Sequence, residues 1–172
     1  EVAPDALKAM QEMAERINII SAERIRDEFI KLVMSNNPRQ GISILVTTGL
    51  AALVLPEIPK LQLEIDEHHH HKDVYEHSLT VLEQAVALEE RLGGKNLVIR
   101  LAALLHDIGK PKTRALIAGG GVSFHHHEVV GARLAKERLK KLRFSNDVID
   151  QVETLIALHL RFHGYGDGEW TD

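Results

Sequence analysis

A histidine and an aspartate, His106 and Asp107, stand side by side at the end of an apolar segment, in the run LAALLHDIGKP at residues 101–111. Burying such a pair costs free energy unless a partner offsets the lost hydration. Divalent metals are common partners of imidazole and carboxylate groups in proteins. Other histidines lie at helix-register positions around this pair: His77, His127 and His159. The set predicts a metal-dependent phosphohydrolase site inside a helical domain.

Taken singly, each of these histidines is more simply explained as an ordinary core or surface residue. His77 stands three residues after Val74, and His159 stands three residues after Ile156, so both share a helix face with apolar side chains. The interpretation changes because three separate segments could surround one His-Asp pair. A ligand set of imidazole and carboxylate groups without sulfur suits one or two divalent ions of Mg, Mn, Fe, Ni or Zn. The partial negative charge at the helix end before Asp107 also favours a cation.

Lys110 follows the His-Asp pair within one helical turn and has two interpretations of equal weight. It could neutralise the carbonyl groups of the preceding helix end. It could instead hold a phosphate oxygen beside the metal. Under the second interpretation Asp107 and Lys110 are the catalytic residues, with Asp107 anchoring or bridging the metals and Lys110 stabilising charge on the phosphate.

Residues 133–143 carry an excess of positive charge. Such a run is usually a solvated helix face, and composition slightly favours that interpretation. The alternative is a phosphate-binding surface for RNA. The formal net charge of −4 gives no global attraction to nucleic acid, so any RNA contact must come from a local patch. The candidate RNA-binding residues are Arg133, Lys136, Lys140, Lys141 and Arg143.

Almost every periodic segment predicts a helix, so the expected fold class is all-α. The expected helices cover residues 4–17, 21–33, 38–48, 74–92, 97–108, 126–142 and 146–160. Ser21 is a typical N-cap, Pro38 suits a first helical position, and Gly49 suits a helix end. Residues 50–55 predict a short apolar turn, and the glycines at 119–121 predict a flexible loop. Strand signals are weak throughout.

The 172 residues are enough for a sizeable core and one or two small domains. Without cysteine, neither a disulfide framework nor a thiolate metal site is possible. The chain has no apolar run long enough for a membrane span and no visible signal peptide, so we expect a cytoplasmic protein. The Pro-bounded stretch from Pro56 to about Leu63 is the best internal boundary, and it divides residues 1–60 from residues 61–172.

The chain begins with Glu1 rather than Met, and we interpret it as part of a longer protein. The histidine run at residues 68–71 lies between plausible native elements, and we expect it to be natural rather than a purification tag. The Gly-rich tail after Leu160 contains Asp167. A lone aspartate in such a loop is usually a turn residue, so we do not predict Asp167 as a ligand.

Several motifs are distributed over the whole chain. They are SAERIRDE at 21–28, TGL at 48–50, LPE at 55–57, YEH at 75–77, LLHDIGKP at 104–111, FHHHE at 124–128 and GA at 131–132. The combination of His77, His106-Asp107 and Gly109-Lys110 resembles the HD superfamily of metal-dependent phosphohydrolases. The whole set resembles the post-catalytic region of bacterial CCA-adding tRNA nucleotidyltransferases of the poly(A) polymerase group, in the actinobacterial form that carries an HD domain.

This resemblance implies a helical neck and body for RNA binding in residues 1–60 and an HD helical bundle in residues 61–172. It implies His77, His106 and Asp107 as ligands of one metal, with His127 and His159 as the extra histidines of a two-metal arrangement. HD proteins commonly add a later aspartate, and we expect this chain to stop before it. The nucleotidyltransferase head precedes these segments in the family, so this chain alone is not expected to add CCA.

The expected function is therefore the C-terminal part of a tRNA nucleotidyltransferase with an HD-type phosphohydrolase site. The resemblance implies the tRNA 3′ end as a partner and 2′,3′-cyclic or terminal phosphates of RNA or nucleotides as substrates. The alternative is a non-catalytic tRNA-binding module whose HD pocket is structural. A free-standing nucleotide phosphohydrolase is a third possibility, against which the neck-like residues 1–60 argue.

Overall fold

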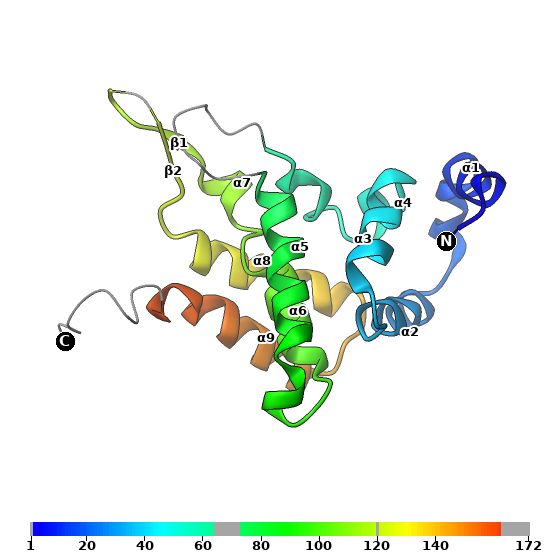
Figure 1. Cartoon of the computed structure of the whole chain (residues 1–172). Helices are drawn as coiled ribbons and strands as arrows, with labels where there is room; N and C mark the ends of the chain where they lie inside the picture. The colour runs from blue at the N-terminus through cyan, green and yellow to red at the C-terminus, as the bar shows by residue number, and fades with distance from the viewer. Residues whose placement is uncertain (1, 64–72, 120, 163–172) are drawn as a thin grey trace.

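The computed structural model describes residues 2–63, 73–119 and 121–162, and these are mostly helical (Figure 1). The predicted all-α class is confirmed. The α-helices are α1 (Pro4–Glu12), α2 (Ala22–Val33), α3 (Pro38–Thr47), α4 (Leu50–Val54), α5 (Val74–Ala87), α6 (Leu97–Leu105), α7 (Lys110–Thr113), α8 (His127–Lys141) and α9 (Asn146–Leu158). Short 3-10 helices join or extend them: η1 (Ala14–Ile19), η2 (Pro59–Leu61), η3 (Glu89–Leu92) and η4 (His159–Phe162). No helix in the described ranges has the length and apolar character needed to cross a bilayer.

The capping signals act as the sequence predicts. The Ser21 hydroxyl accepts a hydrogen bond from the backbone N–H of Arg24 and so begins α2. Gly49 follows α3 with φ +79°, a left-handed conformation that suits glycine and ends the helix. Residues 50–54 differ from the expectation, because they form the short helix α4 rather than a turn.

A small two-stranded hairpin flanks the segment in which the glycines predicted a flexible loop. Strand β1 (Ala115–Leu116) pairs antiparallel with β2 (Val122–Ser123), and Ala115 lies opposite Ser123. Strands of two residues are too short to show alternating hydrophobicity, so the sequence pattern carried no signal for them. The hairpin follows α7 and projects from the helical body (Figure 1).

One hydrophobic core runs through both halves of the chain. Helix α6 lies at its centre, with Leu101, Leu104 and Leu105 fully buried, as its apolar sequence predicts. It packs against α5, α9 and α2, while α8 packs on α9 and α3 on α5. In Figure 1 the N-terminal helices α1–α4 lie to the right of α5 and α6, α8 crosses behind these two helices, and α9 extends from them to the left.

A buried arginine, Arg100, joins the two halves of the chain. The guanidinium of Arg100, in α6, is fully buried and binds both carboxylate oxygens of Glu89 at 2.6 and 2.7 Å. It also donates to the carbonyl oxygens of Val33 and Ser35, at 2.6 and 2.7 Å, and so satisfies the C-terminal end of α2. Helix α6 is thus held by the N-terminal segment as well as by its own bundle.

Two expectations fall outside the described residues. They concern the histidine run at residues 68–71 and the Gly-rich tail with Asp167. Both remain predictions.

Candidate metal centre

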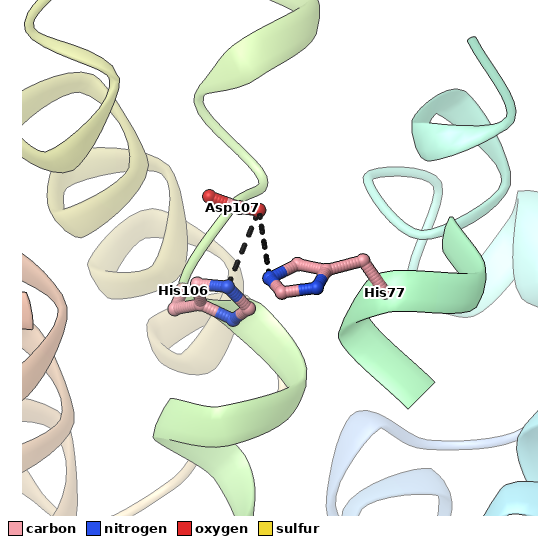
Figure 2. Close-up of side chains that lie close together, drawn as sticks. All are labelled: His77, His106 and Asp107. Atoms are coloured by element: carbon pink, nitrogen blue, oxygen red, sulfur yellow. Dashed lines mark ion pairs between the residues drawn. The ribbon is translucent and has the colours of Figure 1, made fainter. Parts of the chain in front are cut away.

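The structure brings the five predicted ligand residues together at one buried carboxylate. His77 lies in the first turn of α5, while His106 and Asp107 directly follow α6. His127 is the first residue of α8, and His159 directly follows α9. Asp107 is only 1% exposed, and the imidazoles from these separate elements surround it. Figure 2 shows the rings of His77 and His106 directed at the same oxygen of Asp107.

The two oxygens of Asp107 face different histidines. Its Oδ2 lies 3.2 Å from Nε2 of His106 and 3.8 Å from Nε2 of His77. Its Oδ1 lies 3.3 Å from Nε2 of His127 and 3.9 Å from Nε2 of His159. Two groups of three ligand atoms result, each with all of its atoms within 4.8 Å of one another, and they share Asp107. A carboxylate in this position can bridge two ions.

Three of the rings are fixed in the same way, by a hydrogen bond to a backbone carbonyl oxygen. Nδ1 of His106, His127 and His159 lies 2.6–2.8 Å from the carbonyl oxygen three residues earlier in the chain. A carbonyl group only accepts hydrogen bonds, so Nδ1 is the protonated nitrogen that donates. Such bonds fix the ring orientation and leave Nε2 as the ligand atom. The accepting carbonyls belong to Ala103, Phe124 and Ile156.

The neutral rings would therefore present lone pairs to the carboxylate and to one another. Nε2 of His127 lies 3.3 Å from Nε2 of His159, a distance at which two lone pairs repel. A cation among them removes this repulsion, and it is either a proton on the rings or a metal ion. Burial lowers the pKa of His159 and thus disfavours the protonated ring there. The donor set fits a divalent metal.

Asp107 is held in its ionised form. Burial by itself would raise its pKa, but the contacts with His106 and His127 and the charge of Lys110 hold that pKa well below its usual value. The ammonium of Lys110 lies 2.7 Å from Oδ2 of Asp107 and 5.7 Å from the centre of the Phe124 ring. Lys110 therefore pairs with the carboxylate of the site rather than with the carbonyls that end α6.

The site opens toward α5. The side chain of His77 is 49% exposed, whereas the side chains of His106, His127 and His159 are 12%, 10% and 14% exposed. The Lys110 side chain is 21% exposed. A ligand would therefore approach the cluster past His77 and Lys110.

The predicted RNA-binding residues lie on or just after α8, but they do not share one environment. Lys136 forms an ion pair with Glu153 at 2.6 Å, and Arg143 lies 3.9 Å from Glu23. The other three are exposed and have no ion pair with any residue that the structure describes: Arg133, Lys140 and Lys141. The unpaired positive charge is thus smaller than the sequence count suggested.

Sequence reasoning missed the carbonyl groups of Ala103, Phe124 and Ile156. No signal in the sequence could have found them, because every residue type supplies a carbonyl oxygen. Their role depends on where each helix begins or ends and on the ring that follows three residues later.

A family model described as "HD domain" matches residues 74–170. The chain belongs to the HD domain family. A second family model, described as "Probable RNA and SrmB- binding site of polymerase A", matches residues 1–61.

Curated relatives extend the likeness over most of the chain. An A-adding tRNA nucleotidyltransferase of Deinococcus radiodurans is 36% identical over 148 residues, which cover 86% of this chain and 33% of the relative. A multifunctional CCA protein of Neisseria meningitidis is 32% identical over 170 residues, covering 96% of this chain and 39% of the relative. A CC-adding tRNA nucleotidyltransferase of Thermus thermophilus is 34% identical over 139 residues, covering 80% and 31%.

The matched part of this chain thus spans between 31% and 39% of the length of these relatives. The resemblance to tRNA nucleotidyltransferases that carry an HD domain, inferred above from the motifs, is confirmed by these matches.

Proposed function

We propose that this HD domain is a divalent-metal-dependent phosphohydrolase that acts on phosphoesters of RNA ends or nucleotides. The observation that carries the proposal is the convergence of imidazole Nε2 atoms on both oxygens of one buried carboxylate. A buried cluster of ligand atoms that is held by carbonyl hydrogen bonds suits a metal better than it suits an ordinary core.

In this proposal Asp107 would serve both of two ions. One ion would be held by His77, His106 and Asp107, and the other by His127, His159 and Asp107. When bound, divalent metals polarise a phosphoryl oxygen and supply a nucleophile by lowering the pKa of water. Oxygen and nitrogen ligands do not select strongly among Mg²⁺, Mn²⁺, Fe²⁺, Ni²⁺ and Zn²⁺.

The other residues of the site would handle the substrate. The ammonium of Lys110 lies against Asp107 and can turn to a phosphate oxygen, where it would stabilise the charge that develops during hydrolysis. The half-exposed ring of His77 marks the side on which the phosphate would enter. The burial of the other rings would keep bulk water away from the reacting phosphate.

We further propose that the chain works on tRNA, as the names of its relatives suggest. Residues 1–61 match the RNA-binding model, and Arg133, Lys140 and Lys141 offer positive charge to phosphates. If the HD site were inactive, this RNA-binding role would remain as the function of the chain.

The deciding experiment measures hydrolysis by the purified chain loaded in turn with Mn²⁺, Co²⁺, Ni²⁺, Zn²⁺ and Mg²⁺. The substrates are 2′,3′-cyclic AMP and a short RNA that ends in a 2′,3′-cyclic phosphate. We expect ring opening with at least one metal, and no turnover by Asp107→Ala. The matched control is Asp150→Ala, at an exposed carboxylate of α9, which should keep full activity. Equal rates for the chain and Asp107→Ala with every metal would reject catalysis and leave the RNA-binding role.

A further inference from the structure

We infer that two glycines, Gly109 and Gly131, set the spacing of the metal ligands and are positioning residues of the site. This inference rests on the proposed function above. Neither glycine is needed for its backbone conformation. Gly109 has φ −77° and ψ −25°, and Gly131 lies inside helix α8, so both adopt values open to any residue. What these positions provide is space for a close approach of two backbones.

Gly109 stands two residues after Asp107, in the turn between α6 and α7. A Cβ atom at this position would overlap the carbonyl oxygen of His127 and lie 2.7 Å from the backbone nitrogen of Gly131. Both are main-chain atoms of α8, which cannot rotate away as a side chain can. The first turn of α8 therefore lies directly on the turn that carries Asp107.

Gly131 meets this turn from the other side. A Cβ atom there would lie 3.2 Å from the backbone nitrogen of Gly109 and 3.4 Å from the carbonyl oxygen of His106. It would also lie 3.5 Å from Cγ2 of Ile156, in α9. The first contact is tighter than an ordinary van der Waals contact and the second is at the lower limit of one, so α8 or the turn at Gly109 would have to give by a few tenths of an ångström.

This one position touches three segments that carry ligands. Gly131 itself lies one turn after His127 on α8. Ile156 accepts the Nδ1 hydrogen bond that orients His159. Moving α8 away from Gly131's neighbours would lengthen the distance from His127 to Asp107 and to His159, which are both 3.3 Å. Metal ligands tolerate little displacement of this kind.

Helix propensity points the same way. Alanine forms helices better than glycine does, so a glycine inside α8 weakens the helix. The close approach to the Asp107 turn gives a reason for a glycine at this position. If no close approach were needed, alanine at position 131 would raise the melting temperature.

The test compares Gly131→Ala with a matched control, Gly41→Ala in α3. A Cβ atom at Gly41 would also be crowded, at 2.7 Å, but its three nearest atoms all belong to the flexible side chain of Leu32. Circular dichroism verifies folding, and each variant is titrated with Co²⁺ while its visible spectrum is recorded. Crystal structures of the metal-free chain and of Gly131→Ala give the ligand spacing directly.

We expect Gly131→Ala to bind Co²⁺ about 10-fold to 100-fold more weakly, the usual effect of disturbing the support of metal ligands. Its visible spectrum at saturation should differ from that of the unsubstituted chain, and its distance from His127 Nε2 to Asp107 Oδ1 should exceed the original 3.3 Å. Gly41→Ala should keep the affinity and the spectrum. Gly109→Ala should lose more Co²⁺ affinity than Gly131→Ala.

Unchanged ligand spacing in the crystal structure of Gly131→Ala would overturn the inference, as would an unchanged Co²⁺ affinity and spectrum. If the unsubstituted chain itself binds no Co²⁺, the proposed function is rejected. The crystal structures then decide the spacing inference by themselves, because they do not depend on metal.

Discussion

Replacing Asp107 with asparagine should abolish metal binding with little change of shape. Among the described residues, Asp107 belongs to both groups of ligand atoms, and each of its oxygens faces two histidines. Asparagine keeps the size of the side chain but removes its negative charge. It also replaces one oxygen with an NH₂ group that can only donate. Both candidate ions would therefore lose a ligand or its charge.

The magnitude follows from the electrostatics of the site. Two unit charges 4 Å apart interact with about 4 kcal/mol at an effective dielectric constant of about 20. A divalent ion carries twice that charge, and it would lie closer to its ligand, so this value is a lower limit. Since about 1.4 kcal/mol corresponds to a tenfold change, the affinity should fall at least about a thousandfold. Wild-type Asp107 needs no deprotonation before it binds metal, because its pKa is held well below the usual value.

Isothermal titration with Mn²⁺ and Co²⁺ at neutral pH measures this loss. The control is Asp150→Asn, the same chemical change at an exposed position of α9. Thermal unfolding of metal-free Asp107→Asn shows whether the fold is retained. An affinity of Asp107→Asn within tenfold of the unsubstituted chain would refute the bridging role of the carboxylate.

Four other predictions come from the same structure. His77→Ala, which removes the most exposed ligand, should abolish one of two Co²⁺ binding events in a titration, and two unchanged events would contradict the two-ion arrangement. Arg100→Met leaves Glu89 buried without its partner and should lower the free energy of unfolding in urea by about 3–5 kcal/mol. The hydrogen bond from Arg100 lowers the pKa of Glu89, so the ionised carboxylate stabilises the fold at neutral pH. This contribution to the free energy of unfolding should be lost as the pH falls below about 4.3, the ordinary pKa of the carboxyl group. Glu89→Gln should flatten this dependence of stability on pH. Charge reversal at both Lys140 and Lys141 should weaken tRNA binding and reduce the slope of log affinity against log salt by about two, whereas an unchanged slope would remove α8 from the RNA-binding surface.

The parts of this structure that could be predicted are those fixed by local chemistry. Ser21 and Gly49 act within one turn of their own positions, so their types alone locate the ends of α2 and α3. The central place of α6 follows from its nearly uniform apolar sequence. The convergence of the histidines was predicted because buried imidazoles beside a buried carboxylate share one requirement, a cation.

The parts that could not be predicted depend on contacts between distant segments. In the sequence Arg100 is a single charged residue in an apolar helix. Only the fold shows that it binds Glu89 and the end of α2. The run at residues 133–143 reads as one basic surface, but Lys136 is paired with Glu153 seventeen positions later in the chain. The partner of a charged side chain is set by tertiary packing, which a sequence pattern does not contain.

Helix α6 connects these two kinds of feature. Its buried Arg100 donates a hydrogen bond to the C-terminal end of α2, which lies in the segment that matches the RNA-binding model. The C-terminal end of α6 leads directly into His106 and Asp107. Because a helix is a rigid element, α6 holds the turn with His106 and Asp107 at a fixed distance from the N-terminal segment. Gly109 and Gly131 then fix α8 against that turn. An RNA bound to the N-terminal segment would therefore meet the candidate metal centre at a distance set by the core rather than by a hinge.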